Sequence, residues 1–133
     1  QIVPAMNQIE LHPYCQQPRV LEFCQHHGIT VTAYSPLGSQ VEKNGGKPQL
    51  LEDATIKRIG DVHKKSPAQI CLHWGIQRGT VVIPKSSTTE HIKQNAEIFG
   101  FELSETDMTD LAALDRRLRY VDPYGRWKIP YFE

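Results

Sequence analysis

The sequence predicts an α/β fold built on a parallel sheet, because three short apolar segments are each followed by a helical pattern. We expect strands at residues 4–10, 29–34 and 80–84. The second of these is rich in β-branched residues, as in a strand that is covered on both faces. Ligands of parallel α/β sheets gather at the carboxyl ends of the strands, so a functional site is expected at that edge.

The first helix is expected over residues 19–27. Proline is favoured in a first helical turn and glycine after a last one, which suits Pro18 and Gly28 at the two ends. Apolar residues spaced three and four apart form the face that a helix buries. The predicted inward stripe of this helix is Val20, Phe23 and Cys24.

Further helices are expected over residues 53–64, 66–78 and 89–98, and from Ser104 onward. Ser66 is followed by a proline, and Ser104 is followed three residues later by an acid. Both patterns are typical of helix starts, because the serine side chain accepts a hydrogen bond from a free backbone N–H. In the helix at 89–98 the expected apolar stripe is Ile92, Ala96 and Phe99.

The charge balance and the cysteines exclude several classes of function. The 133 residues contain 15 basic and 15 acidic side chains, and nucleic-acid or anionic-membrane surfaces need clustered positive charge instead. No apolar run approaches the roughly 20 residues that cross a bilayer. Cys15, Cys24 and Cys71 lack metal-ligand spacing, so we expect no metal site and a reducing, cytoplasmic location.

Residues 82–89 carry the strongest functional signal. We interpret them as a strand that ends at Lys85 and several hydroxyl residues. A helix begins directly after it, with Thr88 or Thr89 as the N-cap. A cation, hydroxyls and free backbone N–H groups at one point favour an anion, most simply a phosphate. The alternative is that Lys85 is an ordinary solvated charge at a strand end.

Three motifs stand out along the chain: Asn-Gln-Ile-Glu-Leu-His-Pro-Tyr at 7–14, Ala-Tyr-Ser-Pro-Leu-Gly-Ser at 33–39 and Ile-Pro-Lys-Ser at 83–86. Together they resemble the C-terminal half of an aldo-keto reductase. Their order and separations agree with that family over essentially the whole chain, and residues 120–123 and 130–133 are similar to its C-terminal segment.

The resemblance implies a partial (β/α)8 barrel. The chain, residues 1–133, would be the C-terminal part of an NADP(H)-dependent oxidoreductase barrel domain, with a tail segment at 116–133. It would hold about the last three β/α units plus extra helices. A full barrel takes ~250 residues, so a chain of this length cannot close one. Because the sequence begins at Gln1 without a methionine, we interpret it as partial.

The resemblance also assigns the nicotinamide and pyrophosphate contacts. Gln8 would hydrogen-bond the nicotinamide carboxamide, and Tyr34 would stack on the ring, for which a flat phenol offers a large contact area. Packed or backbone-bonded structural roles for these two residues stay open. The pyrophosphate would lie along the loop after the second strand, which is lined by Ser35, Leu37 and Ser39.

The 2′-phosphate of NADP would lie on the segment that follows the third strand. The resemblance gives this role to Lys85, Ser86 and Thr88, and Ser87 belongs to the same segment. Trp127, in the tail, would border the substrate pocket.

Two departures from the family pattern concern the adenosine end. Asn95 and Gln94 would reach the adenine edge, with Gln94 in place of the usual glutamate. His91 stands where the family usually has an arginine. Histidine as a residue type is only partly charged near pH 7 and offers one donor at a time, so the phosphate should be held less firmly. NADP is therefore the expected cofactor, and NAD is possible beside it.

The family's catalytic set of Asp, Tyr, Lys and His lies on strands before the sixth, so no residue of this chain is assigned a catalytic role. We expect the chain to supply the cofactor-binding half of a reductase that converts an aldehyde or ketone to an alcohol, monomeric and acting on a small carbonyl substrate. A non-catalytic cofactor-binding subunit and an inactive truncated fragment are the alternatives. One basic cluster is interpreted as a solvated helix end: Arg116, Arg117 and Arg119.

Overall fold

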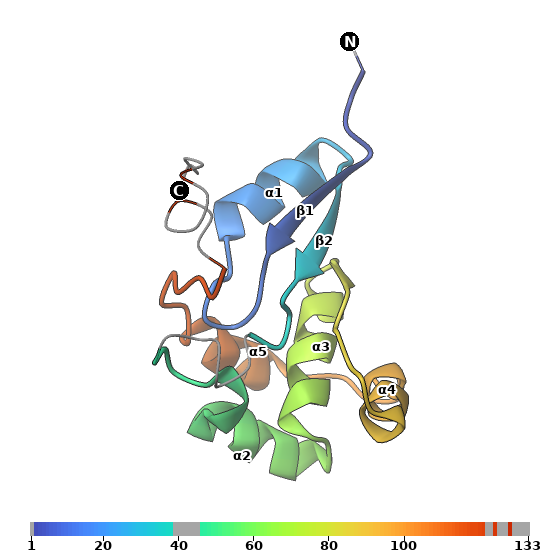
Figure 1. Cartoon of the computed structure of the whole chain (residues 1–133), viewed down its shortest axis with the longest axis vertical. Helices are drawn as coiled ribbons and strands as arrows, with labels where there is room; N and C mark the ends of the chain where they lie inside the picture. The colour runs from blue at the N-terminus through green and yellow to red at the C-terminus, as the bar shows by residue number, and fades with distance from the viewer. Residues whose placement is uncertain (1, 39–45, 122–123, 125–127, 129–133) are drawn as a thin grey trace.

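The computed structural model describes residues 2–38, 46–121, 124 and 128; Ser39 and Trp127 lie outside these ranges. Three parallel strands form one sheet in the order β1 (Met6–Glu10), β2 (Thr30–Tyr34), β3 (Val81–Val82). Each lies within its predicted range. The arrangement of strands and helices in Figure 1 confirms the predicted α/β class with a parallel sheet.

Several helices begin where the sequence signals predicted. Ser66 and Gln69 form a capping box in which each side chain accepts a hydrogen bond from the other residue's backbone N–H. Ser104 and Asp107 form a second one. The α-helices are α1 (Pro18–His26), α2 (Ala54–His63), α3 (Pro67–Gln77), α4 (Thr89–Ala96) and α5 (Glu105–Ala112), and a short 3-10 helix spans Leu50–Glu52.

The main core lies where α3 packs against α2 and β3, with α5 against α2. Gly75 shows how closely α3 and β3 approach, because a Cβ built on it would lie 2.7 Å from Val82 Cγ1. The glycine is thus required by packing rather than by a turn. The side chains that are almost wholly buried here include Ile56, Ile59, Ile70, Trp74 and Leu111.

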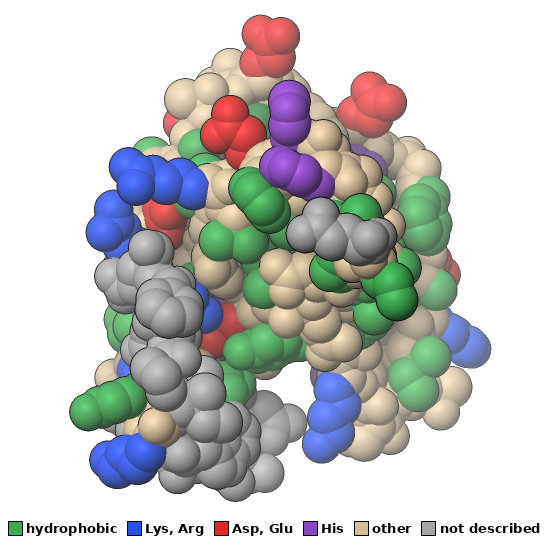
Figure 2. All heavy atoms as spheres, turned by 90° about the horizontal axis from the view of Figure 1, so that it is seen from above, with side chains coloured by type: hydrophobic (Ala, Val, Ile, Leu, Met, Phe, Trp, Pro, Cys, Tyr) green, Lys and Arg blue, Asp and Glu red, His purple; other side chains and the backbone are tan. Residues whose placement is uncertain are grey.

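Helix α1 buries only part of its predicted stripe: Cys24 is buried and Val20 packs partly buried against the core, but Phe23 does not. Leu21 and Cys24 are buried, whereas Phe23 is 58% exposed and stacks on His27 with ring centroids 4.2 Å apart. On this end of the molecule hydrophobic and histidine side chains lie beside each other (Figure 2). The prediction that Phe23 points inward is wrong, because the sheet covers the face of α1 that carries Leu21 and Cys24.

Helix α4 also differs from its prediction. None of its described side chains is buried, and Ile92 and Phe99 are 54% and 75% exposed. The helix is attached to α3 through its backbone, where Gln69 Nε2 donates to the carbonyl of Gln94 at 3.1 Å. The periodic run correctly predicted a helix, but the body of the molecule does not cover its apolar residues.

The segment after α5 returns to the connection between β1 and α1. The backbone N–H groups of Arg116 and Leu118 both donate to the carbonyl of Tyr14, at 3.1 and 2.9 Å. The backbone N–H of Tyr120 then donates to Glu10 Oε1 at 2.6 Å. These contacts place residues 116–121 beside the carboxyl end of β1. No helix within the described ranges has the length and apolar character that a membrane span requires.

Candidate functional site

The carboxyl ends of the strands meet at one edge of the sheet. Glu10 lies opposite Tyr34, so β1 and β2 end at the same level. Pairing continues just beyond β3, where the N–H of Ile83 donates to the carbonyl of Ala33 at 3.3 Å. The chain then leads directly into the Lys85 segment. The edge at which a site was expected therefore carries residues from all three strands.

Gln8 and Tyr34 lie on the same face of this sheet. Asn7 Nδ2 donates to Cys24 Sγ on α1 at 3.6 Å, so Gln8, the next residue of the strand, points to the other face. That second face also carries Thr32, whose hydroxyl donates to Met6 Sδ at 2.8 Å. Tyr34 is two residues beyond Thr32 and thus shares its face. Gln8 itself is exposed and lies opposite Thr32 in the register.

Tyr34 is half-buried at the end of β2. Burial raises the pKa of its phenol, and the nearby negative charge of Glu10 raises it further. The ring therefore stays neutral throughout the physiological range. A neutral, partly exposed aromatic ring at the sheet edge suits a stacking surface better than a proton donor.

A tight turn follows Tyr34. Ser35 has a left-handed backbone, with φ of 49°, and its carbonyl accepts the N–H of Gly38 at 2.9 Å. Gly38 has φ of 73°, and a Cβ there would lie 2.8 Å from Tyr120 Cε2. The turn is therefore packed beneath the segment that follows α5. Leu37 is partly buried against the core rather than pointing freely outward.

The connection from β3 to α4 forms the other part of the predicted site. Thr88 is the N-cap of α4, and its hydroxyl accepts the backbone N–H of His91 at 3.4 Å, as the sequence predicted. The Ser86 hydroxyl accepts the N–H of Thr88 at 3.4 Å. Lys85 and Ser87 are exposed, and within the described part of the chain Lys85 has no ion-pair partner. A cation and a hydroxyl-capped helix start are thus brought together at an accessible point.

The adenosine-end residues lie on α4. His91 is exposed in its first turn, and Asn95 is half-buried. The side chain of Gln94 donates to Glu90 Oε1 at 3.1 Å, so in this conformation it points along its own helix. His91, Gln94 and Asn95 therefore share one short helix, but Gln94 is already engaged.

Glu10 has a structural role that its sequence context did not predict. This fully buried carboxylate accepts hydrogen bonds from the N–H of Tyr120 and contacts His12 Nε2 at 3.2 Å. The sequence hints at this role only by placing an acidic residue at the end of an apolar strand. Burial of a carboxylate there costs free energy unless the carboxylate is hydrogen-bonded or paired. His12 Nδ1 is buried and has no hydrogen-bond partner within the described residues.

The interpretation of the arginines after α5 as a solvated helix end holds only in part, because Arg116 and Arg117 are exposed but do not lie at a helix end. The helix ends at Ala112, and Arg116 lies over the Tyr14 ring at 4.2 Å and pairs with Asp53 at 3.6 Å. Arg119 Nη2 donates to Gln17 Oε1 at 3.2 Å. Within the ranges that the structure describes, no group of three His, Cys, Asp or Glu side chains is placed to hold a metal ion.

The chain is a parallel α/β unit with polar and aromatic groups at the carboxyl ends of its strands, which is the place where α/β proteins as a class bind their ligands. The sequence matches the model of the aldo/keto reductase family over residues 1–116, and the chain belongs to that family.

Three curated relatives illustrate the similarity. The chain is 48% identical to an NAD(P)H-dependent D-xylose reductase of Scheffersomyces stipitis, over 98% of this chain and 43% of that protein. It is 46% identical to aldose reductase B of Dictyostelium discoideum, over 99% of this chain and 40% of that protein. It is 40% identical to an NADP-dependent D-sorbitol-6-phosphate dehydrogenase of Malus domestica, over 98% of this chain and 43% of that protein. The chain thus spans less than half the length of these relatives.

Proposed function

We propose that this chain is the cofactor-binding part of an NAD(P)H-dependent reductase that converts a small aldehyde or ketone to an alcohol. The observation that carries the proposal is that Gln8 and Tyr34 share one face of the sheet. Tyr34 stands at the end of β2, Gln8 lies two residues before the end of β1, and the Lys85 segment leaves the sheet at this same edge. Family membership supports it, as does the similarity to relatives named for NAD(P)H-dependent sugar reduction.

The residues fit a nicotinamide dinucleotide by their chemistry. An exposed amide at Gln8 can bond a carboxamide, and the neutral ring of Tyr34 offers an apolar surface for a flat heterocycle. Lys85, Ser86 and the free N–H groups at the start of α4 are donors suited to a phosphate. When bound, the cofactor would supply the hydride, and the residues of this chain would fix its orientation.

The proposal leaves proton donation to residues that this chain does not supply. Tyr34 holds its proton firmly, and its assigned role is stacking. Trp127 is proposed to border the carbonyl substrate. The proposal includes a cytoplasmic location, with which the buried thiols of Cys15, Cys24 and Cys71 agree, and a monomeric whole protein without nucleic-acid or membrane partners.

Titration of the chain with NADPH, followed by nicotinamide fluorescence, tests the proposal. We expect weak binding, because only part of the ring's environment is present, and sub-micromolar affinity would contradict that expectation. Tyr34→Leu and Lys85→Gln should each weaken binding roughly tenfold, about 1.4 kcal/mol. The control Lys57→Gln removes an exposed lysine on α2 and should leave binding unchanged. Equal effects of all three variants would remove the assigned site.

A further inference from the structure

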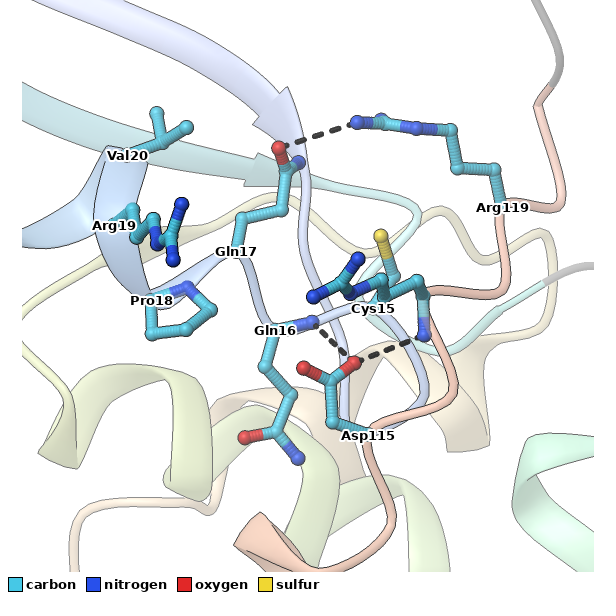
Figure 3. Close-up of a pocket in the computed structure, with 9 residues that line it drawn as sticks. Cys15, Gln16, Gln17, Pro18, Arg19, Val20, Asp115 and Arg119 are labelled. Carbon is cyan, nitrogen blue, oxygen red and sulfur yellow. Dashed lines mark hydrogen bonds between the residues drawn. The ribbon is translucent and has the colours of Figure 1, made fainter. Parts of the chain in front are cut away.

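A separate cavity of about 200 Å³ lies between the β1–α1 connection, the first turn of α1 and the segment after α5 (Figure 3). One water requires only ~10–15 Å³ of such space, so the cavity has room for a small chemical group. None of the residues assigned to the cofactor lines this cavity: they lie on β1, at and after the end of β2, in the Lys85 segment and on α4. The cavity is therefore not explained by the proposed function.

The walls of this cavity are positively charged. Three of the lining side chains are arginines, Arg19 on α1 and Arg117 and Arg119 after α5, and the one acidic lining residue is Asp115. Arg19 and Arg117 bring two positive charges to the cavity from two different segments. Neither Arg19 nor Arg117 has an ion-pair partner among the described residues. Two segments almost a hundred residues apart in the sequence thus direct like charges to one space.

Asp115 joins the two segments through the backbone. Its Oδ1 accepts the N–H of Gln16 at 3.4 Å and the N–H of Arg117 at 3.1 Å (Figure 3). This carboxylate therefore serves as a structural clamp between the β1–α1 connection and the later segment. Among the residues that the structure describes, it forms no ion pair within 4.0 Å with the arginines that line the cavity.

The Gln17 side chain is fixed at both ends. Gln17 Nε2 donates to the carbonyl of Glu10 at 2.6 Å, and Gln17 Oε1 accepts from Arg119 Nη2 at 3.2 Å. This hydrogen bond orients the Arg119 guanidinium toward Gln17. Figure 3 shows Gln17 between Arg19 and Arg119, so charged groups stand on both sides of it.

Like charges gathered in a cavity repel each other, and an anion between them removes that cost. The guanidinium fork matches the oxygens of phosphate and carboxylate, to which it can donate two hydrogen bonds at once. We propose that this cavity binds the compact oxyanion of a small organic molecule, a phosphate ester in first place. The inference stands independently of the proposed cofactor site.

The test uses the 15N-labelled chain and four probes: inorganic phosphate, a hexose 6-phosphate, the neutral hexose and the corresponding hexonate. Saturable shifts of the amides at residues 16–20 and 115–119 with the phosphates, and none with the hexose, are the expected result. A response to the hexonate of equal strength would reassign the ligand to carboxylates. Shifts spread over the whole surface, or none with any anion, would overturn the proposal.

Variants show whether the arginine charges are responsible. Arg19→Gln with Arg117→Gln should weaken phosphate-ester binding at least tenfold, whereas Arg19→Lys with Arg117→Lys should retain part of it. Arg58→Gln removes an exposed arginine elsewhere, on α2, and should have no effect. Equal weakening by Arg58→Gln would indicate non-specific attraction and overturn the site. The Gln variants should leave NADPH affinity unchanged and Lys85→Gln should leave phosphate-ester affinity unchanged, so the two proposals can fail separately.

Discussion

Glu10 Oε1 accepts a hydrogen bond from the backbone N–H of Tyr120, 110 residues later in the chain, at a distance of 2.6 Å. Val121 donates to the same carboxylate at 3.3 Å, and His12 Nε2 lies 3.2 Å away. Glu10 and His12 are both 0% exposed. The last residue of β1 thus holds the segment after α5 at the edge of the sheet, next to the position of Tyr34.

We expect Glu10→Gln to destabilise the fold and loosen that segment. The amide keeps the shape but replaces an acceptor oxygen by a donor, which leaves a buried N–H without a partner and costs about 1–3 kcal/mol. Urea unfolding measures the loss, and cleavage by trypsin after Arg119 should become faster. Glu22→Gln, an exposed change on α1, is the matched control. Unchanged cleavage in Glu10→Gln would show that the contact does not restrain the segment.

Two glycine-to-alanine changes should act in opposite directions. Alanine favours a helix over glycine by about 1 kcal/mol, yet Gly75→Ala would place a Cβ 2.7 Å from Val82 Cγ1. Overpacking of this kind costs about 1–3 kcal/mol, so we expect net destabilisation. A Cβ added at Gly100 would meet no atom within 4 Å, and Gly100→Ala should be neutral or slightly stabilising. Urea unfolding of both variants is the measurement, and equal stabilities would contradict the close α3–β3 contact.

Asp107 should make the stability of the fold decrease at acid pH. Burial alone would raise the pKa of this carboxyl, but hydrogen bonds from His63 and Ser104 outweigh burial, so the pKa lies below its ordinary value. His63 Nε2 is 2.9 Å from Asp107 Oδ2, which joins α2 to α5. A depressed pKa in the folded state means that stability is present above the unfolded pKa, about 4, and is lost as the pH falls through the folded value.

Asp107→Asn should remove this contribution. The variant should be less stable than the wild type at pH 7, by about 1–2 kcal/mol for the lost hydrogen bonds, and the difference should shrink below about pH 4. Urea unfolding at a series of pH values between 7 and the acid limit is the measurement. Asp61→Asn changes an exposed carboxyl on α2 and should show neither effect. A constant difference at every pH would mean that titration of Asp107 is not coupled to folding.

Local signals in the sequence predicted the elements well. Serine before proline at Ser66 and serine with an acid three residues later at Ser104 each mark a helix start, because capping depends on residues within one turn. The parallel sheet follows from strands that alternate with helices. That all three strands end at the same side of the sheet could likewise be expected, since the strands of a parallel sheet run in one direction.

Which face of a helix is covered could not be predicted in the same way. Periodicity shows that Phe23 and Ile92 can lie on an apolar stripe, but burial depends on distant segments that meet the helix. The same reason hides the bond from Glu10 to Tyr120 and the contact of Arg119 with Gln17, whose partners lie about a hundred residues apart. The spacing of residues along the chain does not predict which distant residues will contact each other.

His91 offers the sharpest test of cofactor choice in the whole protein. Its side chain is exposed in the first turn of α4, and its backbone N–H is bonded to the hydroxyl of Thr88, so a longer side chain can be placed there without disturbing the cap. His91→Arg should tighten NADPH by about 1–3 kcal/mol through a charge-assisted bond to the 2′-phosphate. NADH lacks that phosphate and should bind almost as before.

The measurement is the binding of both cofactors to the His91→Arg and His91→Gln variants at two salt concentrations. Added salt screens exposed charges, so the gain from arginine should shrink at high salt if it comes from the phosphate. The glutamine variant keeps a donor without the charge and should show little gain. If arginine tightened NADPH and NADH equally, residue 91 would act on a part that both cofactors share, and the phosphate would have to be bound elsewhere.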